Sequence, residues 1–492
     1  MTDLSQPPFG PTSANESGDI LRMRALFERQ RLAFDAAPYP ELAARKAKLH
    51  KLIAALRRYQ DDIVAAVNDD FGVRAAAETK LVEVMVPILE ARHALSHAGR
   101  WMKPRRRSTE LLFMSNRAWV AYQPKGVVGI IGTWNFPLYL TLGPLVAALA
   151  AGNRAMIKVS EYSPRCTALL TTMLAECFDE DEVAVCGGEV AAAQAFSALP
   201  FNHLVFTGSP LVGRHVMRAA SEHLTPVTLE LGGKSPAIVG PDADLHDAAL
   251  RIAHGKVFNA GQICVAPDYA LVPRGKADAF AAAVAEAFKR LVPQVGGNAE
   301  YTSIITERHA ARLRDLLADA QAKGATLLPC GADAGSGRQL PLTVVTHVND
   351  GMRLMQEEIF GPILPVLEYE RLDDAMALVR RGERPLSLYG LGLSAAEQAR
   401  VLKETHAGGV TFNDWGWHVF QHDLPFGGIG NSGMGTYHGE EGFRELSHAK
   451  GVFKRHRWFP VGLFYPPYGN LVQRLAMKFF IGSAPTPTRP PR

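Results

Sequence analysis

The chain has 492 residues, of which 47% are hydrophobic and 21% are charged, close to the usage of ordinary globular proteins. These values exclude a mainly disordered, collagen-like or disulfide-stapled chain. The formal net charge is only +4, which gives no support to a nucleic-acid-binding protein. The five cysteines are sparse and form no CxxC pair, so we expect a reducing compartment, the cytoplasm.

The amino-terminal part of the chain predicts helices followed by a strand. The first residues, MTDLSQPPFGPTSANESGD, are polar and lack the apolar run of a secretory signal. Long Ala/Leu/Arg/Glu-rich runs over the first hundred residues predict helices. The basic run at Lys103 and 105–107 favours a solvated turn. The patch LLFMSNRAWVAYQP (111–124) then predicts a strand.

The segment 126–153 contains no charged residue and is long enough to span a bilayer. Several residues that break helices or carry polar groups interrupt it: Asn135, Pro137, Gly143 and Pro144. We therefore predict two buried elements instead, a strand over 126–131 and a helix over about 138–151, joined by GTWNFP.

Apolar strands alternate with helices beyond this point. The first alternating region reaches a helix at about 210–221, and the second runs from about 235 to 425, with helices at 276–291 and 372–381. This alternation predicts an α/β fold with a parallel sheet. No long Ser/Gly linker separates the two regions, so a domain boundary between them must lie at a short crossing.

Cys264, in FNAGQICVAPDY, is a candidate nucleophile because a thiolate is strongly nucleophilic and the preceding glycine permits close backbone approach. The alternative is a small buried hydrophobic residue. The remaining cysteines stand in helical or strand-like contexts and are interpreted as structural: Cys166, Cys177, Cys186 and Cys330.

Two polar residues in apolar surroundings are further candidates. Glu230, in TLELGGKSPAIV, is either a general base with a raised pKa or a paired core carboxylate. Asn135 either aims its NH₂ at a developing oxyanion or caps the following helix.

Two strand ends carry groups that suit a nucleotide. In VFTGSPLVGRHV, a strand leads to Gly208 and Ser209, and Gly213 opens a helix whose free N–H groups suit a phosphate. In AMIKVSE, Lys158 and Glu161 follow a strand and either clasp a ribose or form a surface ion pair. Both signals are weak when taken alone.

The late part of the chain is rich in glycine and aromatic residues. Seven glycines lie between 427 and 442, a density that suits a cofactor or catalytic wall. Trp415, Trp417 and Phe420 form either an aromatic substrate wall or part of the core. His422 and His438 are interpreted as isolated, and no cluster has metal-ligand spacing, so no metal site is expected.

The carboxyl-terminal segment predicts an amphipathic helix, because apolar residues between Leu471 and Phe480 recur at helical spacing. We expect this helix to pack on the body or on a partner subunit. The alternative is weak peripheral contact with a membrane surface. The last residues, SAPTPTRPPR, predict a frayed tail.

Seven motifs occur in an order and approximate spacing that resemble the NAD(P)-dependent aldehyde dehydrogenase superfamily. They are GTWNFP, IKVSE, FTGS, ELGGKSP, GQIC, EEIFGP and PFGGIGNSG. The resemblance covers about residues 20–455. AGQICVAPDY and FGGIGNSGMGTYHGEEGFRELSH are most similar to the class 3 branch, which handles fatty and aromatic aldehydes. YPPYGNLVQRL is similar to the tails of bacterial coniferyl-aldehyde dehydrogenases.

The resemblance implies a three-part α/β fold. The Rossmann-like NAD-binding domain would comprise 1–110 and 125–232, with part of 426–450. The catalytic α/β domain would be 233–425. A small β oligomerisation element with the C-terminal tail would comprise 111–124 and 451–492. The branch also implies a homodimer.

The resemblance assigns roles to the candidates. Cys264 would be the nucleophile and Glu230 the base, while Asn135 and the Cys264 backbone N–H would form the oxyanion hole. The residues that would bind the cofactor are Lys158, Glu161, Gly208, Ser209, Gly213, Gly232, Gly233, Glu358 and Phe360. The substrate pocket would include Tyr139, Trp415, Trp417 and Phe420.

The implied reaction oxidises a hydrophobic aldehyde, aromatic such as coniferyl or long-chain aliphatic, to its acid through a Cys264 thiohemiacetal and thioester. Where many members read KPSE this chain reads KVSE. Glu161 would repel a ribose 2′-phosphate, so NAD is expected ahead of NADP. A CoA-acylating enzyme typically lacks the glutamate base, which this chain has. A catalytically silent homologue acting as a binding or structural protein is the alternative from another class.

Overall fold

The structure is a computed structural model that describes residues 18–332 and 337–482. The chain divides into two compact units. Of the described residues, the first unit holds 18–102 and 123–448, and the second holds 103–122 and 449–482. Most of the polar N-terminal segment, which is not expected to be a secretory signal, and the expected frayed C-terminal tail lie outside the described ranges.

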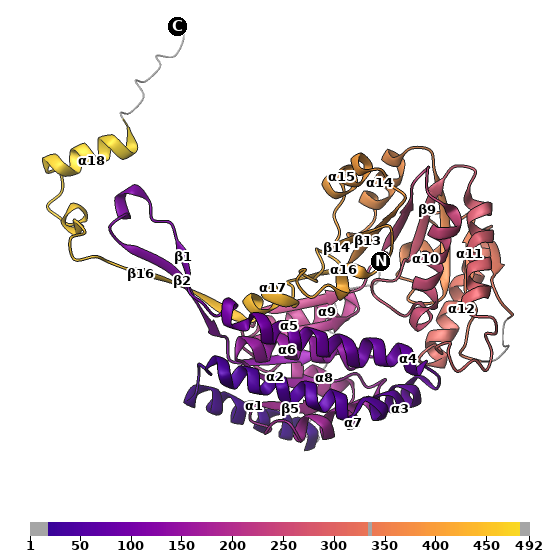
Figure 1. Ribbon diagram of the computed structural model, residues 1–492, viewed down its shortest axis with the longest axis horizontal. Coiled ribbons are helices and arrows are strands. Elements are labelled where there is room, and N and C mark those ends of the chain that lie inside the picture. Colours follow the sequence, from indigo (N-terminus) through magenta and orange to yellow (C-terminus); the bar gives the residue numbers. More distant parts are fainter. Residues whose placement is uncertain (1–17, 333–336, 483–492) are drawn as a thin grey trace, which may run out of the picture. The chain divides into compact units, whose positions relative to one another are not determined.

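Helices precede the first sheet of the larger unit, as the Ala/Leu/Arg/Glu-rich sequence predicts (Figure 1). They are α1 (Gly18–Ala36), α2 (Leu42–Arg58), α3 (Gln60–Phe71), α4 (Ala76–Thr79), the π-helical η1 (Lys80–Met85) and α5 (Val86–Trp101). α2 and α5 both pack against α6 (Tyr139–Ala151). This contact places two residues of η1 and α5, Glu83 and Glu90, beneath the candidate site.

A six-stranded sheet follows, in the order β15-β7-β6-β3-β4-β5. Its strands are β3 (Val127–Ile131), β4 (Arg154–Lys158), β5 (Val183–Cys186), β6 (His203–Gly208), β7 (Val227–Leu231) and β15 (Gly433–Met434). β15 runs antiparallel to β7, and the other strands are parallel. The chain moves from β3 outward to β5 and then returns to β6. The carboxyl ends of β3 and β6 therefore mark a switch point, where open α/β sheets bind ligands.

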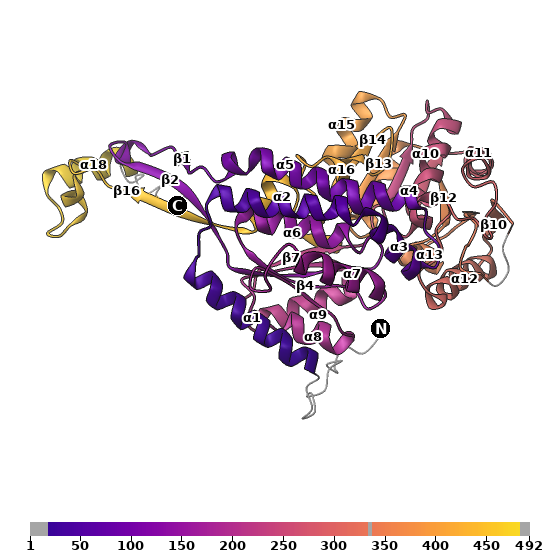
Figure 2. The same cartoon turned by 60° about the horizontal axis from the view of Figure 1, so that its bottom comes forward.

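Helices cover both faces of this sheet. Figure 2 shows α2, α5 and α6 on one side and α1, α8 (Val190–Ser197) and α9 (Pro210–Ser221) on the other. α7 (Pro164–Ala175) packs against β5. Covered on both faces, the strands read as continuous apolar runs.

A seven-stranded sheet forms the other half of the larger unit, in the order β10-β11-β12-β9-β8-β13-β14. Its strands are β8 (Pro236–Val239), β9 (Tyr269–Pro273), β10 (Thr326–Pro329), β11 (Thr343–Thr346), β12 (Ile363–Tyr369), β13 (Ser387–Leu391) and β14 (Gly409–Phe412). Only β10 pairs antiparallel. The predicted parallel α/β architecture is therefore confirmed.

Helices and short helical turns connect these strands. They are α10 (Leu245–Val257), η3 (Phe258–Gly261), α11 (Ala277–Leu291), α12 (Glu307–Ala322), α13 (Arg353–Gln356), α14 (Leu372–Arg381), α15 (Ala395–Glu404), α16 (Trp417–Phe420) and α17 (Gly439–Glu445). The predicted helices at 210–221 and 372–381 match α9 and α14 residue for residue. An amphipathic pattern of this kind therefore predicts both the helix and the residues at which it begins and ends.

The charge-free segment 126–153 forms β3 and α6, as predicted. Every residue of α6 is buried, which explains an apolar pattern on all sides of the helix. No helix within 18–332 and 337–482 is long and apolar enough to cross a membrane.

The second unit contains a three-stranded sheet in the order β1-β2-β16. Its elements are β1 (Arg105–Arg107), η2 (Leu111–Phe113), β2 (Arg117–Pro124), β16 (Ser447–Lys454), η4 (Val461–Phe464) and α18 (Leu471–Ile481). The expected turn at 105–107 is wrong, because these arginines pair with Ala118–Val120 as a strand.

The strand expected over 111–124 is also wrong in its first part. Leu111–Phe113 forms a helical turn, and the strand begins only at Arg117. Between them the Asn116 side chain donates to the Phe113 carbonyl at 3.1 Å. Such a local side-chain bond closes a turn and stops the extended conformation.

The predicted C-terminal helix is confirmed as α18, which Asn470 caps through the Gln473 backbone N–H. Its apolar side chains are exposed: Phe479 is 72% and Ile481 is 78% accessible. What covers this apolar surface, a partner or a membrane, stays a prediction.

Candidate active site

Cys264 follows a loop with an unusual backbone. Asn259, Ala260 and Gly261 have φ angles of 48°, 50° and 70°, three successive residues in the left-handed region. For the two non-glycine residues this conformation is strained unless the surroundings hold it. The Asn259 side chain does so, donating to the carbonyls of Asn135 at 3.1 Å and Gln262 at 3.0 Å. The loop is thereby locked to the segment that follows β3.

Cys264 differs from the other cysteines in its exposure. It is half-buried, whereas Cys166, Cys177, Cys186 and Cys330 are buried, and all five are free thiols. Burial raises the pKa of the Cys264 thiol, and the Glu230 and Glu358 charges raise it further. The backbone N–H groups of Cys264 and Val265 act in the opposite direction. A base beside the thiol would therefore help it to ionise.

Glu230 supplies a carboxyl group close to that thiol. It lies in β7 opposite Gly433 of β15 and is only 2% exposed. Its Oε1 has no hydrogen-bond partner among the described residues. Burial raises the pKa of Glu230 well above the usual range, and the Gly428 backbone N–H opposes this. A raised pKa suits a general base.

Asn135 lies between β3 and α6, and its alternative interpretation as a helix cap is wrong. The α6 N-terminus is bound instead by Glu83, whose Oε2 accepts from the Leu138 N–H at 3.0 Å and the Tyr139 N–H at 2.8 Å. The Asn135 NH₂ donates to the Gln262 carbonyl at 3.1 Å. An amide NH₂ carries two N–H bonds, so the second remains for an oxyanion.

Arg74 and Glu83 position this site, and the sequence analysis did not find them. Both are buried, and Arg74 Nη1 lies 3.2 Å from Glu83 Oε1 and 3.1 Å from the Asn135 carbonyl. The pair therefore fixes both the Asn135 backbone and the start of α6. One signal was available: Glu83 and Glu90 interrupt an apolar helical stretch two turns apart, which places two carboxylates on a buried face.

Lys158 and Glu161 stand at the end of β4, beside the switch point. The surface ion pair considered for them is wrong, because Lys158 is buried and its Nζ donates to the Val159 carbonyl at 2.7 Å. Burial lowers the pKa of Lys158, and the Glu161 charge opposes this. Glu161 is exposed. A buried ammonium behind an exposed carboxylate can clasp a polar ligand at the sheet edge.

The segment from β6 into α9 contains three of the residues expected to bind the cofactor: Gly208, Ser209 and Gly213. β6 ends at Gly208, and the Ser209 hydroxyl accepts from the Val212 N–H at 3.4 Å, capping α9. A Cβ atom at Gly213 would lie 2.7 Å from Leu231 Cδ2, so this glycine lets α9 pack closely against β7.

The Glu358 carboxyl lies directly against Gly232, so a side chain at the glycine would have to displace it. A Cβ atom there would lie 1.9 Å from Glu358 Oε2. At Gly233 it would lie 3.4 Å from backbone atoms. Burial, followed by the Asp268 charge, raises the pKa of Glu358 to about 8. Phe360 has φ 51° and packs edge-on against Trp134 at 5.4 Å between ring centroids.

The expected aromatic substrate residues do not form one continuous wall. Trp415 belongs to the core, and its Nε1 donates to His254 Nδ1 at 3.0 Å. Trp417 is 61% exposed and packs edge-on against Phe420 at 6.1 Å. Tyr139 is buried near Cys264 and Glu230, whose charges contribute to the raised pKa of its hydroxyl after burial and Glu90.

His422 and His438 are not isolated, which corrects the prediction from sequence. Their ring centroids lie 6.4 Å apart, and His438 Nε2 lies 3.1 Å from the Tyr139 hydroxyl. Within the described residues no group of three or more His, Cys, Asp or Glu side chains could hold a metal ion.

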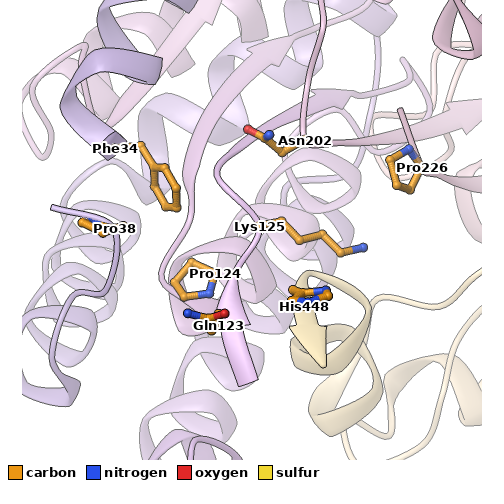
Figure 3. A pocket seen from close by; sticks show the side chains of 8 residues that line it. All are labelled: Phe34, Pro38, Gln123, Pro124, Lys125, Asn202, Pro226 and His448. Carbon is orange, nitrogen blue, oxygen red and sulfur yellow. The ribbon is translucent and has the colours of Figure 1, made fainter. Parts of the chain in front are cut away.

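A surface pocket of about 430 Å³ lies elsewhere in the larger unit (Figure 3). Its lining includes Lys125, whose Nζ lies 2.9 Å from His203 Nδ1, and none of the candidate catalytic or cofactor residues. Since no candidate residue lines this pocket, we assign the pocket no part in the reaction proposed below.

Comparison with known proteins identifies the class. The Aldehyde dehydrogenase family profile matches residues 21–452. A Pseudomonas aeruginosa protein named "Probable coniferyl aldehyde dehydrogenase" is 52% identical over 463 residues, covering 94% of this chain and 97% of that protein. The chain therefore belongs to the aldehyde dehydrogenase family and is an oxidoreductase by class, as the sequence resemblance implied.

Two further comparisons agree with this assignment. The "Coniferyl aldehyde dehydrogenase" of a Pseudomonas species is 42% identical, covering 94% of this chain and 96% of that protein. A crystal structure of Mycobacterium tuberculosis aldehyde dehydrogenase complexed with NAD+ is 29% identical with a TM-score of 0.80, covering 88% of this chain and 90% of that one. The predicted fold class is confirmed, and nothing here favours the silent homologue.

Proposed function

We propose that this protein oxidises hydrophobic aldehydes to carboxylic acids with NAD, and that coniferaldehyde or a similar aromatic aldehyde is its preferred substrate. The observation that carries the chemistry is the half-buried Cys264 thiol together with the buried carboxyl of Glu230, whose Oε1 has no hydrogen-bond partner among the described residues. The coniferyl preference is supported by the names of the 52% and 42% identical relatives. NADP is the second choice of cofactor.

The residues at the switch point fit a dinucleotide. The glycine at 232 makes room for the Glu358 carboxyl beside the proposed cofactor site. Ser209 and Gly208 would face the pyrophosphate, Lys158 and Glu161 the adenosine ribose. Glu358 with Phe360 would hold the nicotinamide ribose. The bound nicotinamide supplies the oxidant of the reaction.

The protein supplies a nucleophile, an oxyanion site and a base. The Cys264 sulfur bonds to the aldehyde carbon, giving a tetrahedral alkoxide. The second N–H of the Asn135 amide and the Cys264 backbone N–H stabilise that alkoxide; one such donor is worth about 3–4 kcal/mol. After oxidation to the thioester, Glu230 takes a proton from the water that hydrolyses it.

Arg74 and Glu83 act as positioning residues in this scheme. They hold the Asn135 backbone and the start of α6, so the amide is pre-organised and no reorientation is needed during the reaction.

The organisation of the chain completes the proposal. The part containing the six-stranded sheet would be the NAD-binding domain, and the part containing the seven-stranded sheet the catalytic domain. The second unit would form a homodimer, with the apolar side of α18 covered by the partner or by weak membrane contact. Five free cysteines support a cytoplasmic location.

Steady-state NADH formation by the purified protein tests the proposal. The panel comprises coniferaldehyde, benzaldehyde, and short and long alkanals, each with NAD and NADP. Cys264→Ala should abolish turnover. Cys177→Ala, at a buried cysteine whose thiol contacts the Lys51 carbonyl and no candidate site residue, should leave turnover within about twofold of the unmodified protein. Fastest turnover with coniferaldehyde is expected. Best turnover with long alkanals would move the substrate to fatty aldehydes, and no Cys264-dependent turnover would defeat the proposal.

A further inference from the structure

Several buried side chains beside the candidate site have polar atoms with no hydrogen-bond partner in the described part of the protein. Five of these atoms are Glu230 Oε1, Glu90 Oε2, Tyr437 Oη, His438 Nδ1 and His422 Nδ1. An unsatisfied buried polar atom is costly, and internal water commonly binds such atoms in folded proteins. Of the five residues, the proposed mechanism uses only Glu230.

The inner members of this set meet at Gly143 in α6. A Cβ atom placed there would lie 3.1 Å from Glu90 Oε2, 3.4 Å from Tyr437 Cε2 and 3.7 Å from Tyr139 Cε2. Burial raises the pKa of both tyrosine hydroxyls, and the neighbouring carboxylates, Glu230 among them, raise it further. Glu230 pairs with Gly433 across β7 and β15, and Tyr437 and His438 follow Gly433 on the same segment, so the backbone brings the proposed base and this group into one part of the fold.

The outer members lead toward solvent. The Tyr139 hydroxyl lies 3.1 Å from His438 Nε2, and the His438 and His422 ring centroids are 6.4 Å apart. Burial lowers the pKa of His422 to about 4, with a further contribution from His93. His93 Nε2 lies 3.3 Å from Asp423 Oδ1, and the Asp423 side chain is 62% exposed.

These contacts define a polar track that runs from the base to the surface. The polar track consists of Glu90, Tyr437, Tyr139, His438, His422 and His93. A hydroxyl group and a neutral imidazole each donate one proton and accept another, so they can pass a proton on without remaining charged. Internal water at the unsatisfied atoms would bridge the gaps that side chains alone do not close.

The reaction creates a need for such a route, given the proposed function on which this inference rests. As water attacks the thioester, the water oxygen bonds to the acyl carbon, its proton moves to the Glu230 carboxylate, and the C–S bond breaks. Cys264 leaves as a thiolate and the acid is released. The proton then sits on a carboxyl group that is 2% exposed. It must reach solvent before Glu230 can act again.

We propose that the polar track, together with internal water, carries this proton from Glu230 to solvent at Asp423. The side chains of the track other than Tyr139 have no role in the mechanism given above. Tyr139, expected from sequence to line the substrate pocket, acts here through its bond to His438. The track leaves attack by Cys264 unchanged and limits only the recovery of the base.

Glu90→Gln and Tyr437→Phe test this at saturating aldehyde and NAD. Each removes a transferable proton with little change in volume. The first turnover of NADH should stay within about twofold, while the steady-state rate falls roughly ten- to a hundredfold, the lower range for loss of assisted proton transfer. Mass spectrometry of acid-quenched enzyme should show the acyl group accumulating on Cys264, which excludes slow cofactor release as the cause.

Tyr301→Phe is the matched control. Tyr301 is equally buried, and its hydroxyl donates to the Leu340 carbonyl at 2.7 Å, away from the track. In the Tyr301→Phe variant, the ratio of the first-turnover rate to the steady-state rate should stay the same as in the unmodified protein. His93→Gln, at the half-buried outer end, provides a test should the inner variants fail to fold, and it should slow only the steady-state phase.

The outcomes separate this inference from the proposed function. Unchanged steady-state rates, or an equal loss in both phases, would overturn the polar track. Absence of NADH formation by the unmodified protein with every aldehyde would instead overturn the proposed function. Slowing of the variants in D₂O that is confined to the steady-state phase would support the track.

Discussion

Two buried carboxylates on neighbouring turns have opposite surroundings. Glu83 has partners for both oxygens: Arg74 on one and two backbone N–H groups on the other. Glu90, seven residues later, is also buried, yet its Oε2 has no partner among the described residues. Burial of an ionised group is tolerated when it is paired, whereas an unpaired carboxyl is held in its neutral form.

The difference in pairing between these two carboxyl groups suggests that they have different tasks, one in positioning and one in proton transfer. The region around Glu83 fixes the backbone of Asn135, so its charges serve position. The region around Glu90 holds a carboxyl, hydroxyl groups and imidazoles that can exchange protons. A buried polar group left unsatisfied is therefore a better pointer to function here than a buried ion pair.

The largest expected effect comes from breaking the paired region. Arg74→Met leaves the Glu83 carboxylate buried without its cation and should destabilise the protein by about 3–5 kcal/mol. Urea denaturation, followed through the first unfolding transition, measures this change in the free energy of unfolding. Arg353→Met is the control, because Arg353 pairs with Glu357 at the surface and its loss should change stability by at most about 1 kcal/mol. Equal losses would contradict the comparison.

An effect of comparable size, which depends on pH, is expected from the unpaired carboxyl. Burial raises the pKa of Glu90 from 4.5 to about 8. Between these values the unfolded chain has released the proton while the folded protein keeps it. Stability is therefore lost as pH rises through that window, by about 1.4 kcal/mol per unit. Tyr139 and Tyr437, which face Glu90, stay neutral because their pKa values are raised.

Glu90→Gln should remove this slope. Urea midpoints of the variant and the unmodified protein, compared at pH 5 and pH 8, check the prediction. The variant should gain stability relative to the unmodified protein at pH 8 and show little difference at pH 5. A parallel pH dependence for both proteins would show that Glu90 keeps a normal pKa.

The smallest effect is expected at Gly143. Gly143→Ala gains about 1 kcal/mol of helix propensity, and the new methyl group approaches Glu90 Oε2 at 3.1 Å. These effects should nearly cancel, leaving the thermal midpoint within a few degrees. Steady-state turnover should fall severalfold because Glu90 is displaced. A loss of stability above 2 kcal/mol would show that the side chains cannot adjust.

Sequence reasoning succeeded where the pattern is local or carried by a motif. The ends of α9 and α14 follow from amphipathic spacing, and Cys264, Glu230 and Asn135 were found because each stands in a motif. The chemical roles of these three residues remain predictions. Short motifs reflect local conformational requirements of the backbone, and these can be predicted from a single sequence.

Long-range partners were beyond reach. The contact between Tyr139 and His438 joins residues 299 positions apart and depends on how α6 and the glycine-rich segment pack. Arg74 is only nine residues from Glu83, but no motif indicates that the two side chains pair. The helical turn before Arg117 was missed for a different reason: a single side-chain bond from Asn116 outweighs the strand propensity of its neighbours.

The pairing of β15 with β7 also bears on how the protein is made. Glu230 lies beside Gly433, which the ribosome adds long after β7 has emerged. The edge of the sheet at the proposed base therefore stays open until β15 has been made, and an unpaired strand edge is prone to wrong associations. A nascent chain ending before Met434 lacks the segment that closes this edge, so activity should require synthesis to pass β15.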